Sequence, residues 1–166
     1  REGFGWYLQW GETTSSSFPD YYSSFQCWAD YDYYDKKTGT YKSIGDNISG
    51  TTYDAANKKW GNRWRIPTVI EWQELIKYCS WKSTTQNGVN GFLVTGRNNQ
   101  SIFLPAAGRK EGNNSVKNRG YYWTANNDPY DIECAQNVTF DIGAYSYPSI
   151  KEWFRYSALS IRAVTE

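Results

Sequence analysis

The chain has 166 residues, enough for a single domain with a buried core. It carries 18 Lys and Arg against 17 Asp and Glu, so its formal net charge of +1 gives no overall field that attracts nucleic acid or an anionic membrane. Histidine is absent, and the three cysteines, Cys27, Cys79 and Cys134, form an odd and widely spaced set. These counts disfavour a disulfide framework, a cysteine-based zinc site and the common general bases, and no apolar run is long enough to span a membrane. We therefore expect no cofactor or metal, no nucleic-acid partner and no membrane insertion.

The first third of the chain is predicted to be one strand followed by irregular chain. Residues 3–10 alternate apolar and polar side chains, which favours a strand. Residues 11–35 are polar and rich in tyrosine, which is typical of a long surface loop, and residues 41–52 continue it. A short helix is expected at about 52–58, after Thr51 or Thr52.

The clearest element is a helix at about 69–79. Pro67 and Thr68 mark its start, and Glu71 completes a Thr-x-x-Glu capping box with Thr68. An apolar stripe follows at helical spacing, formed by Trp72, Leu75, Ile76 and Cys79. We expect this stripe to be buried, with Trp60 or Trp64 packed beside it.

The rest of the chain reads mainly as strands and loops. Asn87-Gly88 and Asn90-Gly91 indicate turns within a loop over residues 80–91. Strands are predicted at 92–95, 101–105, 121–124, 135–141 and 158–164, with loops at 108–120 and 145–156. The predicted class is α+β, with small antiparallel sheets, one main helix, one short helix and long irregular loops.

Several blocks of sequence resemble one known family. They are Ile48-Ser49-Gly50-Thr51-Thr52-Tyr53-Asp54-Ala55-Ala56, Trp60-Gly61-Asn62-Arg63-Trp64-Arg65-Ile66-Pro67-Thr68, Thr84-Thr85-Gln86-Asn87-Gly88-Val89-Asn90-Gly91, Ser101-Ile102-Phe103-Leu104-Pro105-Ala106-Ala107-Gly108, Gly120-Tyr121-Tyr122-Trp123-Thr124 and Leu159-Ser160-Ile161-Arg162. Their order is similar to that of the Fibrobacter succinogenes major paralogous domain, a Bacteroidetes-type version of the C-type lectin-like fold. The resemblance implies one domain over residues 1–166, with its N- and C-terminal strands paired and the family's first strand missing.

One branch of this fold is enzymatic. Formylglycine-generating oxidases share a motif similar to Arg65-Ile66-Pro67-Thr68-Val69-Ile70-Glu71-Trp72, but they use two copper-binding cysteines in the C-terminal half. Only Cys134 lies in that half of this chain, so the resemblance leaves an oxidase a distant third interpretation. We expect a protein without enzymatic activity.

A second branch comprises the variable proteins of diversity-generating retroelements, including phage receptor-binding proteins of the major tropism determinant type. In these proteins an error-prone reverse transcriptase rewrites adenines in a C-terminal coding segment, and the fold displays the changed residues. The resemblance places that segment at about 124–157, between scaffold positions such as Trp123, Phe140 and Leu159. The positions implied to contact a ligand are Asn126, Asn127, Asp128, Tyr130, Asp131, Glu133, Asn137, Thr139, Asp141, Tyr145, Tyr147, Ser149, Trp153, Arg155, Tyr156 and Ser157.

Three interpretations of that segment remain open. It is a diversified face that binds a protein or glycan on a cell surface, a fixed carbohydrate-binding face of a lectin-like surface module, or a polar loop with aromatic residues turned inward. The first implies a location on a phage virion, on a bacterial surface or outside the cell. A calcium loop at Asp30, Asp32 and Asp35 is disfavoured, because the glycine and terminal glutamate of such loops are absent.

Overall fold

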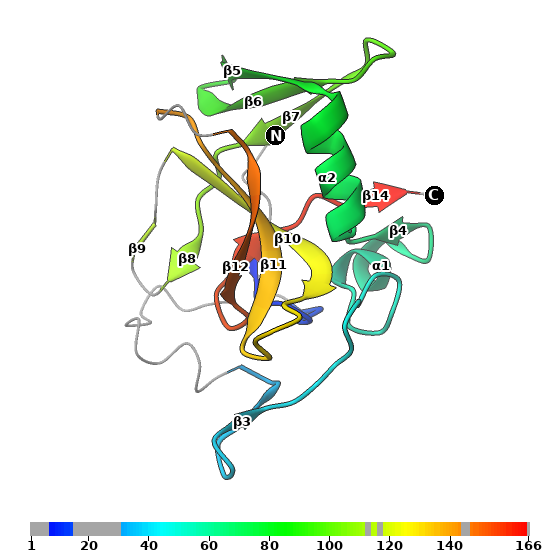
Figure 1. The fold of residues 1–166 in the computed structure, drawn as a ribbon, viewed down its shortest axis with the longest axis vertical. Coiled ribbons are helices and arrows are strands. Elements are labelled where there is room, and N and C mark those ends of the chain that lie inside the picture. Colours follow the sequence, from blue (N-terminus) through cyan, green and yellow to red (C-terminus); the bar gives the residue numbers. More distant parts are fainter. Residues whose placement is uncertain (1–6, 15–30, 112–113, 116–117, 144–146, 166) are drawn as a thin grey trace.

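The structure is a computed structural model that describes residues 7–14, 31–111, 114–115, 118–143 and 147–165 (Figure 1). These residues form a mixed α+β arrangement, mostly short strands in small sheets, with two helices. The helices are α1 (Ala55–Trp60) and α2 (Val69–Tyr78). The strands are β1 (Tyr7–Leu8), β2 (Tyr34–Asp35), β3 (Thr40–Tyr41), β4 (Trp64–Arg65), β5 (Ser80–Gln86), β6 (Val89–Thr95), β7 (Ser101–Pro105), β8 (Lys110–Glu111), β9 (Asn114–Ser115), β10 (Arg119–Asn127), β11 (Cys134–Asp141), β12 (Ser149–Phe154), β13 (Leu159–Ser160) and β14 (Val164–Thr165).

A five-stranded sheet in the order β1-β13-β10-β11-β12 forms the centre of the molecule. Its first pair joins the two ends of the chain, since Tyr7 lies opposite Ser160 and Leu8 opposite Leu159 in antiparallel register. The expected pairing of the N- and C-terminal strands is therefore confirmed. A three-stranded sheet, β5-β6-β7, packs above it, and two-stranded ladders join β14 to β4, β2 to β3 and β8 to β9.

The capping box of α2 is present as predicted. The Thr68 hydroxyl accepts a hydrogen bond from the Glu71 N–H at 3.3 Å, and the Glu71 carboxylate accepts one from the Thr68 N–H at 2.8 Å. Arg65 donates two further hydrogen bonds to Glu71, at 2.8 and 2.7 Å, and these contacts lower the pKa of Glu71 to about 2. The start of α2 is thereby fixed to strand β4.

Two apolar clusters lie on opposite faces of the five-stranded sheet, because neighbouring residues of β10 point to opposite sides. Trp123 belongs to the first cluster, with Trp10, Ile48 and Leu159. Tyr122 belongs to the second, where α2 contributes the buried Trp72 and the half-buried Leu75, Ile76 and Cys79. The stripe of α2 is thus packed as expected, but Trp60 and Trp64 lie elsewhere, against each other.

The α1 helix begins later than expected. Asp54, not Thr51 or Thr52, caps it, and the Asp54 side chain is fully buried. Its Oδ1 accepts hydrogen bonds from the N–H groups of Ala56 and Asn57, and its Oδ2 from those of Gly50 and Ile66. One carboxylate therefore joins the helix start, the loop before it and the strand β4 region.

Three predicted boundaries differ from the structure. Residues 80–91 contain β5, which pairs with β6 across an Asn87-Gly88 turn in which both residues have positive φ (49° and 80°). Residues 149–154, predicted as loop, form the edge strand β12. Pairing with β11 makes this segment a strand, and its own pattern of apolar and polar residues does not indicate one. The predicted final strand splits, since β13 pairs with β1 whereas β14 pairs with β4. Among the described residues, no helix has the length and apolarity to cross a membrane.

Candidate functional site

The sixteen predicted ligand-contact positions follow β10, β11 and β12 and the turns between them. Residues 128–133 connect β10 to β11 at one end of the sheet, and residues 142–148 connect β11 to β12 at the other end. Because β11 has eight residues, these two turns are about 25 Å apart along the strand. The predicted positions therefore do not form one surface.

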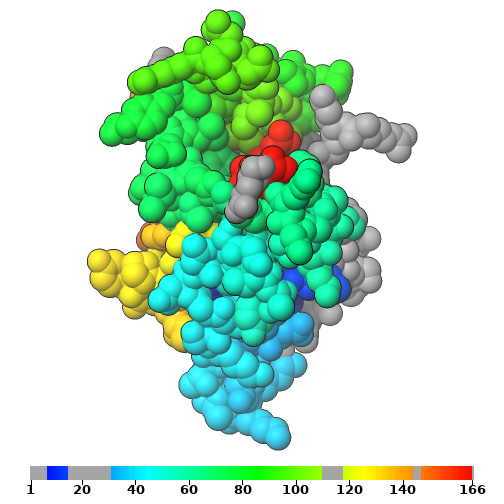
Figure 2. Space-filling model, turned by 90° about the vertical axis from the view of Figure 1, so that its right-hand side faces the viewer, coloured from blue at the N-terminus to red at the C-terminus, as the bar shows by residue number. Residues whose placement is uncertain are grey.

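The end of the sheet at residues 128–133 carries the more prominent apolar side chains. Tyr130 is 96% exposed, Ile132 44% and Phe154 42%. The ring of Tyr156, half-buried, stacks on Phe154 with centroids 5.2 Å apart and planes at 16°. We call Tyr130, Ile132, Phe154 and Tyr156 the turn surface. In Figure 2 the yellow end of the β10–β11 hairpin stands out from the side of the molecule.

The backbone beneath the turn surface is held by the acidic residues of the turn itself. Asp128 Oδ1 accepts hydrogen bonds from the N–H groups of Tyr130 and Asp131 at 2.8 and 2.9 Å. Asp131 Oδ1 accepts from the Glu133 N–H at 2.9 Å, and the Asp131 carbonyl accepts from the Cys134 N–H at 3.0 Å. Asp128 and Asp131 thus fix the turn through side chain to backbone contacts, the usual role of such residues in turns.

Arg155 was expected to contact a ligand, but it is buried, with 1% of its surface exposed. Its Nε donates to the Tyr31 hydroxyl at 3.0 Å, and its Nη1 donates to the carbonyls of Lys42 and Ile132 at 3.2 and 3.0 Å. The guanidinium also lies 4.9 Å from the ring centroid of Trp10. Arg155 therefore connects three segments of the fold from inside and does not face solvent.

Asn137 and Ser157 depart from expectation in the same way, each with 1% exposure. Asn137 lies between Trp123 of β10 and Lys151 of β12, and its Nδ2 donates to the Lys151 carbonyl at 3.1 Å. Asn126 is half-buried, and its Oδ1 accepts from the Val69 N–H at 2.9 Å, which satisfies the first N–H of α2. These polar residues serve the fold.

The remaining predicted positions are spread over the sheet. Tyr147 is 88% exposed but lies in the turn at the far end of β11. Trp153 is half-buried beneath the Arg109 guanidinium, 4.1 Å from its ring centroid, and Asp141 forms an ion pair with Arg119 at 2.7 Å. Tyr145 lies outside the described residues. Asn127, Thr139 and Ser149 are half-buried, and Asp131 and Glu133 are exposed beside the turn surface.

The described residues contain no group of three or more His, Cys, Asp or Glu side chains placed to hold a metal ion. Of the calcium-loop candidates, Asp30 lies outside the described part of the chain, and Asp35 accepts hydrogen bonds from the N–H groups of Lys37 and Thr38 in the β2–β3 turn. Burial, together with the neighbouring Asp131, raises the pKa of the Cys134 thiol to about 12. That thiol is therefore protonated at neutral pH and is a poor nucleophile.

A buried carboxyl group, Glu12, lies close to the Arg155 network. Its exposure is 8%, its Oε2 has no hydrogen-bond partner among the described residues, and burial followed by the charge of Asp32 raises its pKa to about 7. The unfolded chain gives this group its ordinary pKa of 4.5. Between pH 4.5 and about pH 7 the folded protein keeps a proton on Glu12 that the unfolded chain has released. The free energy of unfolding therefore falls as pH rises through this range.

We expect the free energy of unfolding to fall by about 2–3 kcal/mol between pH 5 and pH 8 on this account. Urea denaturation at the two pH values measures it, with Glu12→Gln as the variant that removes the titration. The Glu71 pKa of about 2 acts only in more acidic solution and does not mask the effect. If the free energy of unfolding falls by the same amount between pH 5 and pH 8 in the wild type and in Glu12→Gln, this assignment is wrong.

The sequence does not predict two features, one at the turn surface and one at a separate pocket. Ile132 and Phe154 are not among the predicted candidates, although both are exposed, Ile132 two residues from Tyr130 and Phe154 stacked on Tyr156. An aromatic pocket lined by Trp60, Trp64, Ile161, Arg162 and Ala163 was also missed. Such sites are recognised only in the folded structure, where neighbouring residues leave an apolar side chain partly exposed.

No family model, no curated protein and no solved structure matches this chain. The function proposed below therefore rests on the geometry of the described residues.

Proposed function

We propose that this chain is a non-enzymatic recognition domain that binds a protein or glycan on a cell surface through the turn surface. The observation that carries the proposal is the exposure of Tyr130, Ile132 and Phe154 on a backbone held by Asp128, Asp131 and Arg155. Exposed apolar side chains are common at interaction sites, and Tyr is favoured there. A fixed backbone lowers the ordering cost of binding.

The polar surroundings of the turn surface support the same proposal. Asp131 and Glu133 are exposed beside it, which gives the apolar centre an acidic border. Such a border favours ligands with basic or hydrogen-bond-donating groups at the edge of the contact. We further propose that the domain has the C-type lectin-like fold and is a variable protein of a diversity-generating retroelement, as the sequence blocks suggest. It would reside on a virion or a bacterial surface.

We also propose that the ligand-contact residues vary. The burial of individual side chains narrows the predicted set of ligand-contact positions. Tyr130, Asp131, Glu133 and Tyr156 keep their proposed role, and Ile132 and Phe154 join them. Asn137, Arg155 and Ser157 leave it, because a buried side chain cannot touch a ligand in this conformation. A near-identical repeat beside the gene, differing mainly at adenines, supports diversification; a flanking region without any such repeat favours a fixed face.

The binding test compares the two ends of β11. Tyr130→Ala combined with Phe154→Ala should weaken binding of the labelled domain to bacterial cells at least tenfold, because central aromatic residues carry much of an interface's energy. Flow cytometry over a panel of intact cells measures it. Tyr147→Ala is the matched control, a tyrosine of similar exposure at the far end of β11.

The thermal stability of Tyr147→Ala should stay near that of the wild type, since exposed substitutions usually change stability by about 0.5 kcal/mol or less. The double variant should melt at a lower temperature, because Phe154 is more than half buried and stacks on Tyr156, so thermal melting must show that it is folded at the temperature of the binding assay. Loss of binding in Tyr147→Ala alone, with the double variant unaffected, would assign recognition to the other end of the sheet.

A further inference from the structure

A second candidate site lies between α1, β4 and the segment that joins β13 to β14. Its lining residues are Trp60, Trp64, Ile161, Arg162 and Ala163, and its volume is about 370 Å³. That volume is at the lower end of the range for small-molecule sites, so the pocket suits one ring-sized group. None of its residues belongs to the turn surface.

The two tryptophans form the walls of this pocket. Trp60 is the last residue of α1, and Gly61, with φ of 89°, ends the helix so that the chain returns to place Trp64 on β4. The ring centroids are 5.9 Å apart and the ring planes meet at 61°. Trp60 is 53% exposed and Trp64 39%, so both rings keep open area that the fold does not use.

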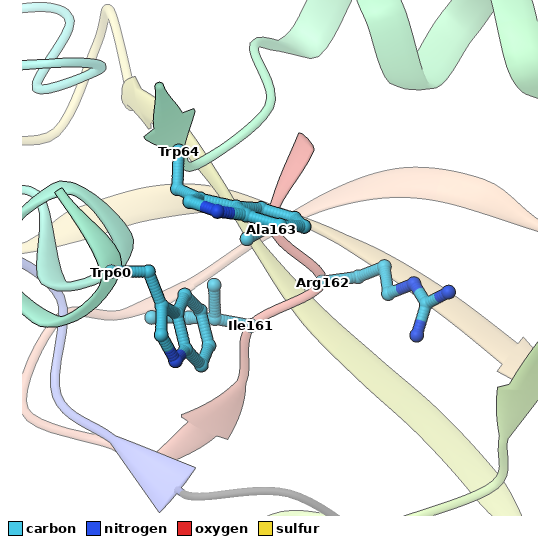
Figure 3. Close-up of a pocket in the computed structure, with 5 residues that line it drawn as sticks. All are labelled: Trp60, Trp64, Ile161, Arg162 and Ala163. Atoms are coloured by element: carbon cyan, nitrogen blue, oxygen red, sulfur yellow. The ribbon is translucent and has the colours of Figure 1, made fainter. Parts of the chain in front are cut away.

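The floor of the pocket is anchored to the core. Ile161 and Ala163 are half-buried and pack against the first apolar cluster. Figure 3 shows Trp64 extending above Ala163, Trp60 beside Ile161, and the Arg162 side chain leading away from both rings. The pocket thus has an apolar interior and a guanidinium at its edge.

Arg162 supplies a charged side chain to the lining of the pocket, and further cations lie in the stretch of chain that carries both tryptophans. The sequence from Ala55 to Ile70 contains Lys58, Lys59, Arg63 and Arg65 and no acidic residue. The two carboxylates that bracket this stretch are both engaged. Asp54 is fully buried on four backbone N–H groups, and Glu71 is paired with Arg65. A pair of indole faces alone would also suit an organic cation, but the guanidinium of Arg162 in the lining disfavours one and favours an anion.

We propose that this pocket binds a sugar ring that carries a carboxylate. The C–H groups of a pyranose are polarised by its oxygens and are attracted to the electron-rich faces of Trp60 and Trp64. The carboxylate would lie at the edge of the pocket, where Arg162 offers two parallel N–H donors. This site goes beyond the proposed recognition by the turn surface, and each is tested without the other.

The test uses methyl β-glucuronide as the probe and methyl β-glucoside as its matched neutral control, which differs only at C6. Proton–nitrogen NMR of the indole N–H groups in the intact chain reports both, with Trp60→Phe and Trp64→Phe assigning the two signals. We expect the glucuronide to shift both signals with an affinity at least tenfold higher than the glucoside, falling as salt increases.

Three variants connect the shifts to the pocket. Trp60→Ala should lower the affinity for the glucuronide at least tenfold, and Arg162→Gln should reduce it to that for the glucoside. Tyr78→Ala, which removes an exposed aromatic residue from α2, should leave both affinities unchanged. Because the wild-type spectrum already maps the site, an unfolded variant does not remove the test.

Several outcomes would overturn the proposal. They are no shift of the Trp60 and Trp64 signals at millimolar glucuronide, equal affinities for the two sugars, or preferential shifts with tetramethylammonium. A dimer in sedimentation that Trp60→Ala dissociates would assign the two rings to contact with a second copy instead.

Discussion

Replacing Asp54 by alanine should lower the free energy of unfolding by about 4–6 kcal/mol, the largest effect we expect from a single substitution. The loss combines the N-cap of α1, about 1 kcal/mol, with two further hydrogen bonds to the buried carboxylate, from the N–H groups of the exposed Gly50 and the buried Ile66, at about 1.5–3 kcal/mol each. Urea denaturation of the purified variant measures it.

Asp54→Asn and Thr68→Ala are informative companions. Asparagine offers one acceptor oxygen and an NH2 group that cannot accept, so Asp54→Asn should lose roughly half as much as alanine does. Thr68→Ala removes the half-buried side chain that caps α2 and should lower the free energy of unfolding by only about 1 kcal/mol. If Asp54→Ala costs no more than Thr68→Ala, the four contacts of Asp54 do not hold these segments together.

Arg155→Ala should be the second most damaging change, at about 3–5 kcal/mol. It leaves the buried Tyr31 hydroxyl and the carbonyls of Lys42 and Ile132 without a donor, and it opens a cavity beside Trp10. Arg155→Met keeps most of the volume and should recover only the packing part of the loss. Tyr130→Ala, on the turn held by Arg155, is the matched control and should change stability by about 0.5 kcal/mol or less.

These values separate two roles for position 155. If it belongs to the frame, a library that varies residue 155 will lose folded members, whereas one that varies residue 130 will keep them. An Arg155→Ala variant as stable as Tyr130→Ala would return this position to the ligand-contact set and contradict the burial argument.

The parts of the fold that the sequence predicts are those determined by near neighbours in the chain. The capping box of Thr68 and Glu71 and the Asn87-Gly88 turn depend on residues at most three apart, and both are present. The start of α1 was misplaced because Thr51 and Thr52 are also good caps, and the choice of Asp54 depends on its contact with Ile66, twelve residues away. Strand β12 was missed because its partner decides it.

The candidate site was harder to predict, since polar residues in an aromatic segment are expected to face solvent. Arg155 is buried because Tyr31 and Lys42, both more than a hundred residues away, supply its partners. Ile132 and Phe154 are exposed because the fold provides no cover for them, which no local pattern signals. The positions of Tyr130 and Tyr147 at opposite ends of β11 follow only from strand pairing.

The alternation of β10 between the two apolar clusters has a consequence for how the domain opens. Tyr121 and Trp123 face one cluster while Tyr122 faces the other, so a single strand is the common wall of both. Neither cluster can lose its packing without exposing the backbone that supports its neighbour. Amide hydrogens on both sides of this wall should therefore exchange with solvent through one shared event, and the short ladders β2–β3 and β8–β9, which lie outside both clusters, should exchange earlier.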